Sequence, residues 1–163
     1  YVQDTFTGIY NRNGFVQASE QLYLDCALND RKVMLMFIDL DGLKNINDTY
    51  GHSVGDNAIR NIADVLEKSC VNGEVYCRFG GDEFIIFGAN YTESEANALT
   101  KSILANIAEI NAQKLNPFVL SASIGHVIAV PKEKRDIFDF VTDADKMMYA
   151  EKRKKKLSKY LKS

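Results

Sequence analysis

The chain has 163 residues, of which 46% are hydrophobic and 26% are charged, and its formal net charge is −2. This length and composition fit one globular domain with its own core and exclude a disordered or low-complexity chain. No apolar run approaches the roughly eighteen residues of a membrane span, and the first residues lack the pattern of a signal peptide, so we expect a cytoplasmic protein.

Hydrophobic spacing and turn residues predict the secondary structure in chain order. We expect a helix from Arg12 to Leu28, a buried strand over 33–40, a helix from Ser53, a hairpin around Gly80-Gly81-Asp82, a helix opened by a capping box at Thr92 and Glu95, a strand over 118–130 and a helix from Asp136 to Leu157. This order predicts the α+β class, with a central, mostly antiparallel sheet flanked by helices. Residues 1–163 are expected to form a single domain, with residues 1–10 as the end of an upstream linker.

The small net charge conceals an uneven distribution. Residues 1–151 carry 13 basic and 22 acidic side chains, whereas the stretch from Lys152 to Lys162 carries seven basic and no acidic ones. Such a stretch is typical of a solvated helix end, whose cations favour the helix dipole, or of a phosphate contact. Nucleic-acid binding is not expected, because Tyr160 is the only aromatic residue among these cations.

Carboxylates occur at two places where the chain is otherwise apolar. Asp39 lies at the end of the apolar stretch 33–40, Asp41 follows on the same face, and Asp82 and Glu83 lie at the hairpin. If the hairpin lies beside the strand, these acids converge and repel one another. Mg²⁺ or Mn²⁺ with oxygen ligands would offset that charge and would bring substrate phosphates with it, which favours nucleotide chemistry. Each stretch taken alone also fits an ordinary turn.

The residues between and within these stretches suggest substrate contacts. Lys44 follows the strand at a distance suited to a phosphate, while Asn47 and Asp56 could bind a guanine edge. Asn47 is equally typical of a turn, and Asp56 of the first turn of a helix. Gly80 and Gly81 lack side chains, so the backbone there could approach a phosphate or a base closely.

Five ordered motifs resemble the GGDEF domain of diguanylate cyclases, and together they cover nearly all of the chain. They read DTFTGIYNRNGF, FIDLDGLKNINDTYGHSVGDN, RFGGDEF, SASIG and ADKMMYAEK. The resemblance implies a fold related to nucleotide-cyclase and polymerase palm domains, with a ferredoxin-like core. It also implies condensation of two GTP into cyclic di-GMP with release of pyrophosphate, by a homodimer that an upstream sensor domain regulates.

The resemblance also assigns roles to individual residues. Asp39, the carbonyl of Leu40, Asp82 and Glu83 would bind the metal; Asp82 and Glu83 would be the catalytic acids; and Leu43, Lys44, Asn47, Asp56, Gly80, Gly81, Lys152 and Lys156 would bind GTP. Asp82 resembles the position that helps to deprotonate the 3′-hydroxyl, although the sequence leaves open which acid is the base and which the metal ligand.

Two departures from the family pattern carry their own expectations. Lys156 stands where the family has an arginine, which keeps the charge and loses bidentate geometry. Val71 stands where relatives with an inhibitory product site have the arginine of an RxxD motif, so we expect no such site. The alternative function is a catalytically silent, GTP-binding regulatory module, which retention of Asp39, Asp82 and Glu83 disfavours; a palm-type enzyme acting on nucleic acid ranks last.

Overall fold

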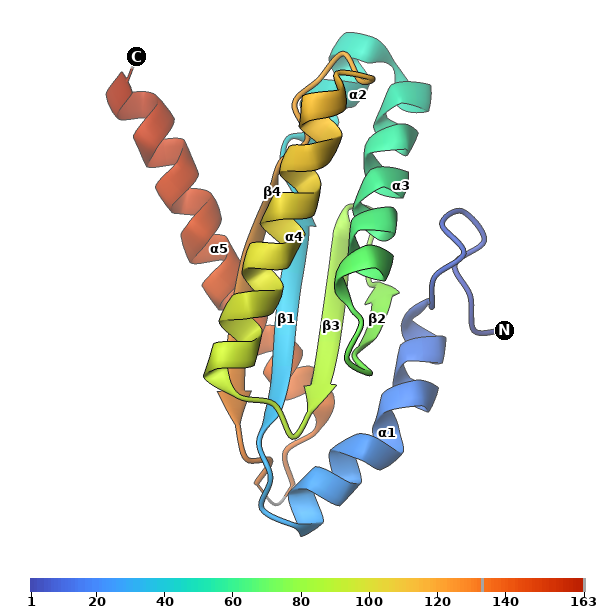
Figure 1. Ribbon diagram of the computed structural model, residues 1–163, viewed down its shortest axis with the longest axis vertical. Helices are drawn as coiled ribbons and strands as arrows, with labels where there is room; N and C mark the ends of the chain where they lie inside the picture. The colour runs from blue at the N-terminus through green and yellow to red at the C-terminus, as the bar shows by residue number, and fades with distance from the viewer. Residues whose placement is uncertain (133, 163) are drawn as a thin grey trace.

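The computed structural model describes residues 1–132 and 134–162; Ser163, the last residue of the predicted domain, lies outside them. The elements are α1 (Arg12–Leu28), β1 (Val33–Leu40), α2 (Leu43–Tyr50), α3 (His52–Ser69), β2 (Val75–Arg78), β3 (Glu83–Ala89), α4 (Glu93–Gln113), β4 (Ala122–Ala129) and α5 (Ile137–Lys162) (Figure 1).

The four described strands form one antiparallel sheet in the order β2-β3-β1-β4. The hairpin of β2 and β3 therefore lies beside β1, as the convergence of the acids requires. In this register Asp39 of β1 lies opposite Glu83 of β3 on one side and opposite Ser123 of β4 on the other. The α+β class with a ferredoxin-like core is confirmed, and the sheet is antiparallel throughout.

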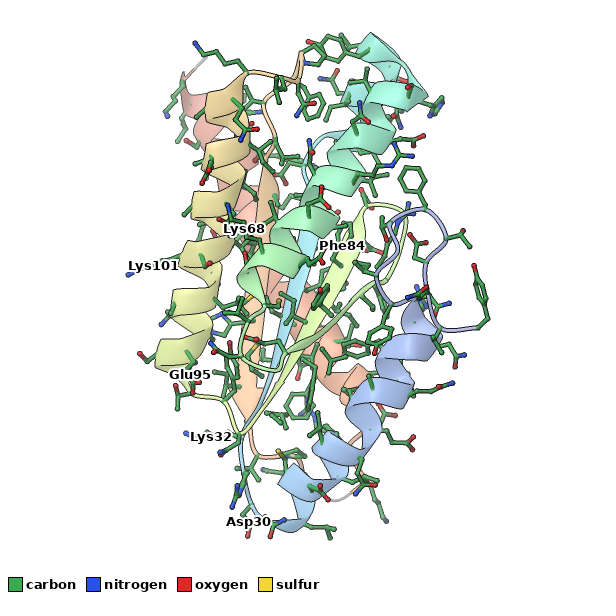
Figure 2. The ribbon with its side chains drawn as sticks, turned by 45° about the vertical axis from the view of Figure 1, so that its right-hand side comes forward. Asp30, Lys32, Lys68, Phe84, Glu95 and Lys101 are labelled. Atoms are coloured by element: carbon green, nitrogen blue, oxygen red, sulfur yellow. The ribbon has the colours of Figure 1, made fainter. Side chains whose placement is uncertain are left out.

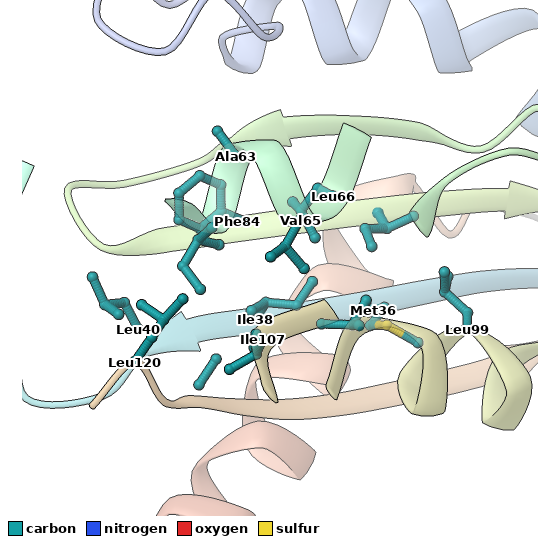
Figure 3. Close-up of a cluster of buried hydrophobic side chains, with 14 of the residues drawn as sticks. Met36, Ile38, Leu40, Ala63, Val65, Leu66, Phe84, Leu99, Ile107 and Leu120 are labelled. Atoms are coloured by element: carbon teal, nitrogen blue, oxygen red, sulfur yellow. The ribbon is translucent and has the colours of Figure 1, made fainter. Parts of the chain in front are cut away.

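Helices cover both faces of the sheet, which explains why all eight residues of β1 are buried. Alternate side chains point to opposite faces. Met36 and Ile38 pack towards α3 and α4, where Figure 3 shows them with Leu66 and Leu99. Figure 2 shows Phe84 beside α3, on the same face of the sheet, while Lys101 points away from α4. Leu35, Phe37 and their neighbours instead meet α1 and α5.

Helix α2 was not predicted, because it is only eight residues long and its apolar side chains are few: Leu43, Ile46 and Tyr50, of which only Ile46 is buried. It lies between two glycines with positive φ, Gly42 (70°) and Gly51 (93°). Gly51 ends the helix, with its N–H donating to the carbonyl of Asn47 at 2.8 Å. The helix turns the chain after β1 and leads directly into α3.

The last strand and helix differ in length from the prediction. β4 begins at Ala122 rather than at residue 118, because the side chain of Asn111 in α4 bonds both the N–H and the carbonyl of Leu120. α5 begins at Ile137, as expected, but continues to Lys162, five residues beyond the predicted end. Its C-terminal half projects beyond the sheet (Figure 1).

Residues 1–10, predicted as the end of a linker, pack against the domain. The ring of Phe6 lies 4.2 Å from the guanidinium of Arg60 and 5.4 Å from that of Arg78. Tyr10 bridges to Cys77 of β2. Among the described helices, none combines the length and apolar character that crossing a membrane requires.

Candidate active site

The candidate site lies where β1 ends, beside the turn that joins β2 to β3; we call residues 79–82 of this turn the tip. Cross-strand partners point to the same face, so Asp39 and Glu83 both face α1 and α5. Lys152 of α5 reaches this face and forms an ion pair with Oδ2 of Asp39. Its Nζ is also 3.9 Å from Oδ1 of Asp41. The fold thus brings acids from two strands together with one cation of the basic stretch.

Among these acids, Asp39 has the most strongly shifted pKa, and it is only 9% exposed. Burial raises its pKa to about 6; the Lys152 hydrogen bond opposes this rise, and the negative charge of Asp82 adds to it. Its second oxygen, Oδ1, is buried without a hydrogen-bond partner. An unpaired buried carboxylate oxygen is unfavourable and is suited to a cation.

The position of the Glu83 side chain accounts for one of the two glycines of the tip. A Cβ at Gly80 would come within 2.2 Å of Glu83 Oε1, so the Glu83 carboxylate lies over this glycine. Burial raises the pKa of Glu83, and the charges of Asp82 and Asp145 raise it further. Gly81 is different, because a Cβ there would meet nothing within 4 Å. A side chain at position 80 would therefore displace the Glu83 carboxylate, whereas one at position 81 would meet nothing within the domain.

Asp41 joins the β1–α2 turn to β4 and α5. Its carboxylate accepts hydrogen bonds from Ser121 Oγ at 2.6 Å, Ser123 Oγ at 2.7 Å and Lys155 Nζ at 2.7 Å. Burial alone would raise the pKa of Asp41, but these hydrogen bonds hold it below its usual value. The sequence grouped Asp41 with the other acids and did not predict these hydrogen bonds to β4 and α5. The two serines of SASIG, two residues apart on one face, were the available signal.

The predicted guanine contacts are brought together by α2 and α3. Asn47 packs against α3 at Gly55, where a Cβ would come within 1.7 Å of Asn47 Oδ1. Asp56 follows Gly55 directly and is partly exposed. Lys44 is exposed on α2 and makes no ion pair in the described chain. Leu43, the first residue of α2, is partly buried.

The basic stretch lines a groove of about 700 Å³ between α2, residues 117–121 and α5. Lys152 and Lys156 both line it, beside Gly42 at the start of α2. Lys156 is exposed and has no ion-pair partner within residues 1–132 and 134–162. Two of the three predicted phosphate-binding lysines therefore share this groove, whereas Lys44 does not line it.

The donor atoms near Asp39 fit a hard divalent cation, although they do not form a complete cage. Residues 1–132 and 134–162 contain no group of three or more His, Cys, Asp or Glu side chains that could hold a metal ion. Leu40 N–H donates to the Asp82 carbonyl at 2.9 Å, but no bond returns from the Asp82 N–H to the Leu40 carbonyl. The Leu40 carbonyl and the unpaired Asp39 oxygen are the type of ligand that Mg²⁺ takes when phosphates and water complete its shell.

Residues 71–74 are the stretch that we expect to lack an inhibitory product site. Val71 is 73% exposed. Glu74, three residues on, is buried and accepts hydrogen bonds from Tyr91 Oη and the Asn72 N–H, each at 2.7 Å. The carboxylate of Glu74 is thus engaged within the domain, and the absence of product inhibition stays a prediction.

Comparison with known proteins identifies relatives over almost the whole chain. Residues 1–158 match the family described as "Diguanylate cyclase, GGDEF domain". The diguanylate cyclase DgcP of Escherichia coli (strain K12) is 31% identical over 97% of this chain and 46% of its own length. The probable diguanylate cyclase DgcJ of the same organism is 34% identical over 94% of this chain and 30% of its own. The chain spans less than half the length of either relative.

Solved structures agree in fold. The GGDEF domain of TpbB (YfiN) from Pseudomonas aeruginosa has a TM-score of 0.80 at 27% identity, over 93% of this chain and 89% of that chain. The GGDEF domain of DgcB from Caulobacter crescentus, in complex with c-di-GMP, has a TM-score of 0.78 at 23% identity, over 93% and 90% of the two chains.

Proposed function

The chain belongs to the diguanylate cyclase GGDEF-domain family, and we propose on that premise that it condenses two GTP into cyclic di-GMP, releasing two pyrophosphates. The observation that supports catalysis best is Asp39, which is buried beside Asp82 and Glu83 with one carboxylate oxygen unpaired. A domain that had lost catalysis would have no need to keep this unfavourable arrangement of acids.

Each side chain has a definite task in the proposed reaction. Asn47 and Asp56 bind the guanine edge, and Lys44, Lys152 and Lys156 bind the phosphates. The Lys152 ammonium must then leave Asp39 for the triphosphate.

Asp39 and the Leu40 carbonyl, together with the signature acids, would hold a divalent cation. When bound, Mg²⁺ or Mn²⁺ supplies positive charge that offsets the charge building on the α-phosphate and the leaving pyrophosphate. One of Asp82 and Glu83 takes the proton of a ribose 3′-hydroxyl. The 3′-oxygen forms a bond to the α-phosphorus of the other GTP while the bond from that phosphorus to the bridging oxygen breaks.

The proposed reaction needs two copies of the domain, because each holds one GTP. The two substrates must face each other with each 3′-oxygen aligned on the other's α-phosphorus, which requires a twofold homodimer. A solved structure of similar fold holds the diguanylate cyclase SiaD of Pseudomonas aeruginosa in complex with its activator SiaC. A partner or an upstream sensor domain that assembles the dimer is part of the present proposal.

A regulatory GTP-binding module is the second candidate function. It is favoured by two relatives named cyclic di-GMP phosphodiesterases, NbdA of Pseudomonas aeruginosa and PdeR of Escherichia coli, which match this chain at 31% identity over 16% and 22% of their own lengths. A domain of this kind would bind GTP without forming product.

Product analysis separates the two candidates. Concentrated protein is incubated with GTP and Mg²⁺, since high concentration favours the dimer, and the products are identified by chromatography and mass spectrometry. We expect cyclic di-GMP from the natural chain and none from Asp82→Ala. The control Glu20→Ala removes an exposed carboxylate from α1 and should retain activity. GTP binding without product would support the regulatory module, and product from Asp82→Ala would refute the mechanism.

A further inference from the structure

The tip is held from one side by two arginines. Arg12 Nε donates to the Phe79 carbonyl at 2.6 Å. Arg78 Nε lies 3.2 Å from the carbonyls of both Gly80 and Gly81, and its Nη2 donates to Gly81 at 2.8 Å. Three consecutive carbonyls of the tip therefore accept hydrogen bonds from guanidinium groups; we call Arg12 and Arg78 the arginine bracket.

Both arginines are themselves fixed in place. Arg12 opens α1, and its guanidinium lies 3.9 Å from the centre of the Phe79 ring. Arg78 ends β2, and its Nη1 lies 3.4 Å from Oδ2 of Asp4. Asp4 is held in turn by the N–H and hydroxyl of Thr7, at 2.9 and 2.7 Å. The bracket thus ties the tip to residues 4–12, which sequence reasoning had assigned in part to a linker.

The opposite side of the tip is tied to β1. Leu40 N–H donates to the Asp82 carbonyl at 2.9 Å, and Glu83 lies opposite Asp39 in the sheet. These contacts orient the side that faces the candidate site, but the bond between Leu40 of β1 and Asp82 is made in one direction only. Within the turn, the N–H groups of Phe79 and Gly80 both donate to the Glu83 carbonyl, at 2.7 and 3.1 Å. These backbone bonds do not involve the carbonyls of Phe79, Gly80 and Gly81, which the two arginines hold instead.

We propose that Arg12 and Arg78 are positioning residues for the reaction proposed above, holding Asp82 and Glu83 in register with Asp39. Neither arginine needs to touch substrate, because each acts through backbone carbonyls of the tip. An arginine suits this task since its planar fork presents several donors in fixed directions, whereas a lysine ammonium is a point charge. Displacement of a catalytic group by about 1 Å can cost on the order of 100-fold in rate.

A positioning role and a purely structural role of the two arginines predict different changes in kcat and in the KM for GTP. The proposed guanine contacts lie on α2 and α3, whereas the hydrogen bonds of the bracket end on carbonyls of the tip, so a loosened tip should lower kcat far more than it raises the KM for GTP. Arg60 provides a matched control: its guanidinium stacks on Phe6 of the same N-terminal segment, and its hydrogen bond goes to Asn57 of α3 rather than to the tip.

The variants Arg12→Lys, Arg78→Lys, the double variant and Arg60→Lys are compared by kcat and KM for GTP, by thermal unfolding, and by hydrogen exchange over residues 79–84 of the metal-free protein. We expect the double variant to lose kcat by about 100-fold, with the KM for GTP raised by no more than about tenfold. We also expect its tip amides to exchange at least about tenfold faster, while Arg60→Lys alters neither property.

Unchanged tip exchange in the double variant, or equal losses in Arg60→Lys, would overturn the proposal. Hydrogen exchange needs no substrate. A natural chain that forms no product would therefore contradict the proposed function, while faster exchange at the tip would still support the bracket.

Discussion

The pKa of Asp39 predicts how the stability of the metal-free protein depends on pH. Burial raises this pKa from 3.8 to about 6, so between these values the native state keeps a proton that the unfolded chain has lost. The stabilisation is complete below about pH 4 and is lost as the pH rises through 6. A shift of this size corresponds to about 3 kcal/mol, of which about 2 kcal/mol falls between pH 4.5 and 7.5.

Urea unfolding of the natural chain and of Asp39→Asn across this pH range measures the effect. The natural chain should lose about 2 kcal/mol of unfolding free energy relative to the variant as the pH rises, and Mg²⁺ at pH 7.5 should restore stability to the natural chain alone. Asp48→Asn, which removes an exposed carboxylate from α2, reports the general effect of losing one charge. A stability of the natural chain relative to Asp39→Asn that stays constant, or that rises with pH, would refute the reasoning.

Three further predictions concern single side chains. Gly81→Ala should leave thermal unfolding nearly unchanged yet weaken GTP binding by about tenfold, measured by calorimetry, whereas Gly80→Ala should also lower kcat because its Cβ displaces the Glu83 carboxylate. Asp56→Ser should lower the preference for GTP over ATP by at least about tenfold in competition binding, and an unchanged preference would remove its role. Thr92→Ala removes the N-cap of α4 and should cost about 1 kcal/mol in urea unfolding; a loss below about 0.3 kcal/mol would show the capping box to be unimportant.

Much of the fold could be predicted because its signals are local. The apolar stretch 33–40 became β1 with the expected bounds, and Thr92 with Glu95 forms the expected capping box. α2 was not predicted, since a helix of eight residues that buries one side chain gives a weak local signal and depends on contact with α3. The roles of the site residues remain predictions, which the mutants above test.

The sequence by itself determined which chemical groups are available, and five motifs identified the family. Only the tertiary structure decided which of these groups meet. Lys152 reaches Asp39 across 113 positions of the chain, and Arg12 reaches the Phe79 carbonyl across 67. Such contacts depend on strand order, on register and on which helix covers which face. These features follow from burying both faces of one sheet at once, and no local pattern of residues encodes them.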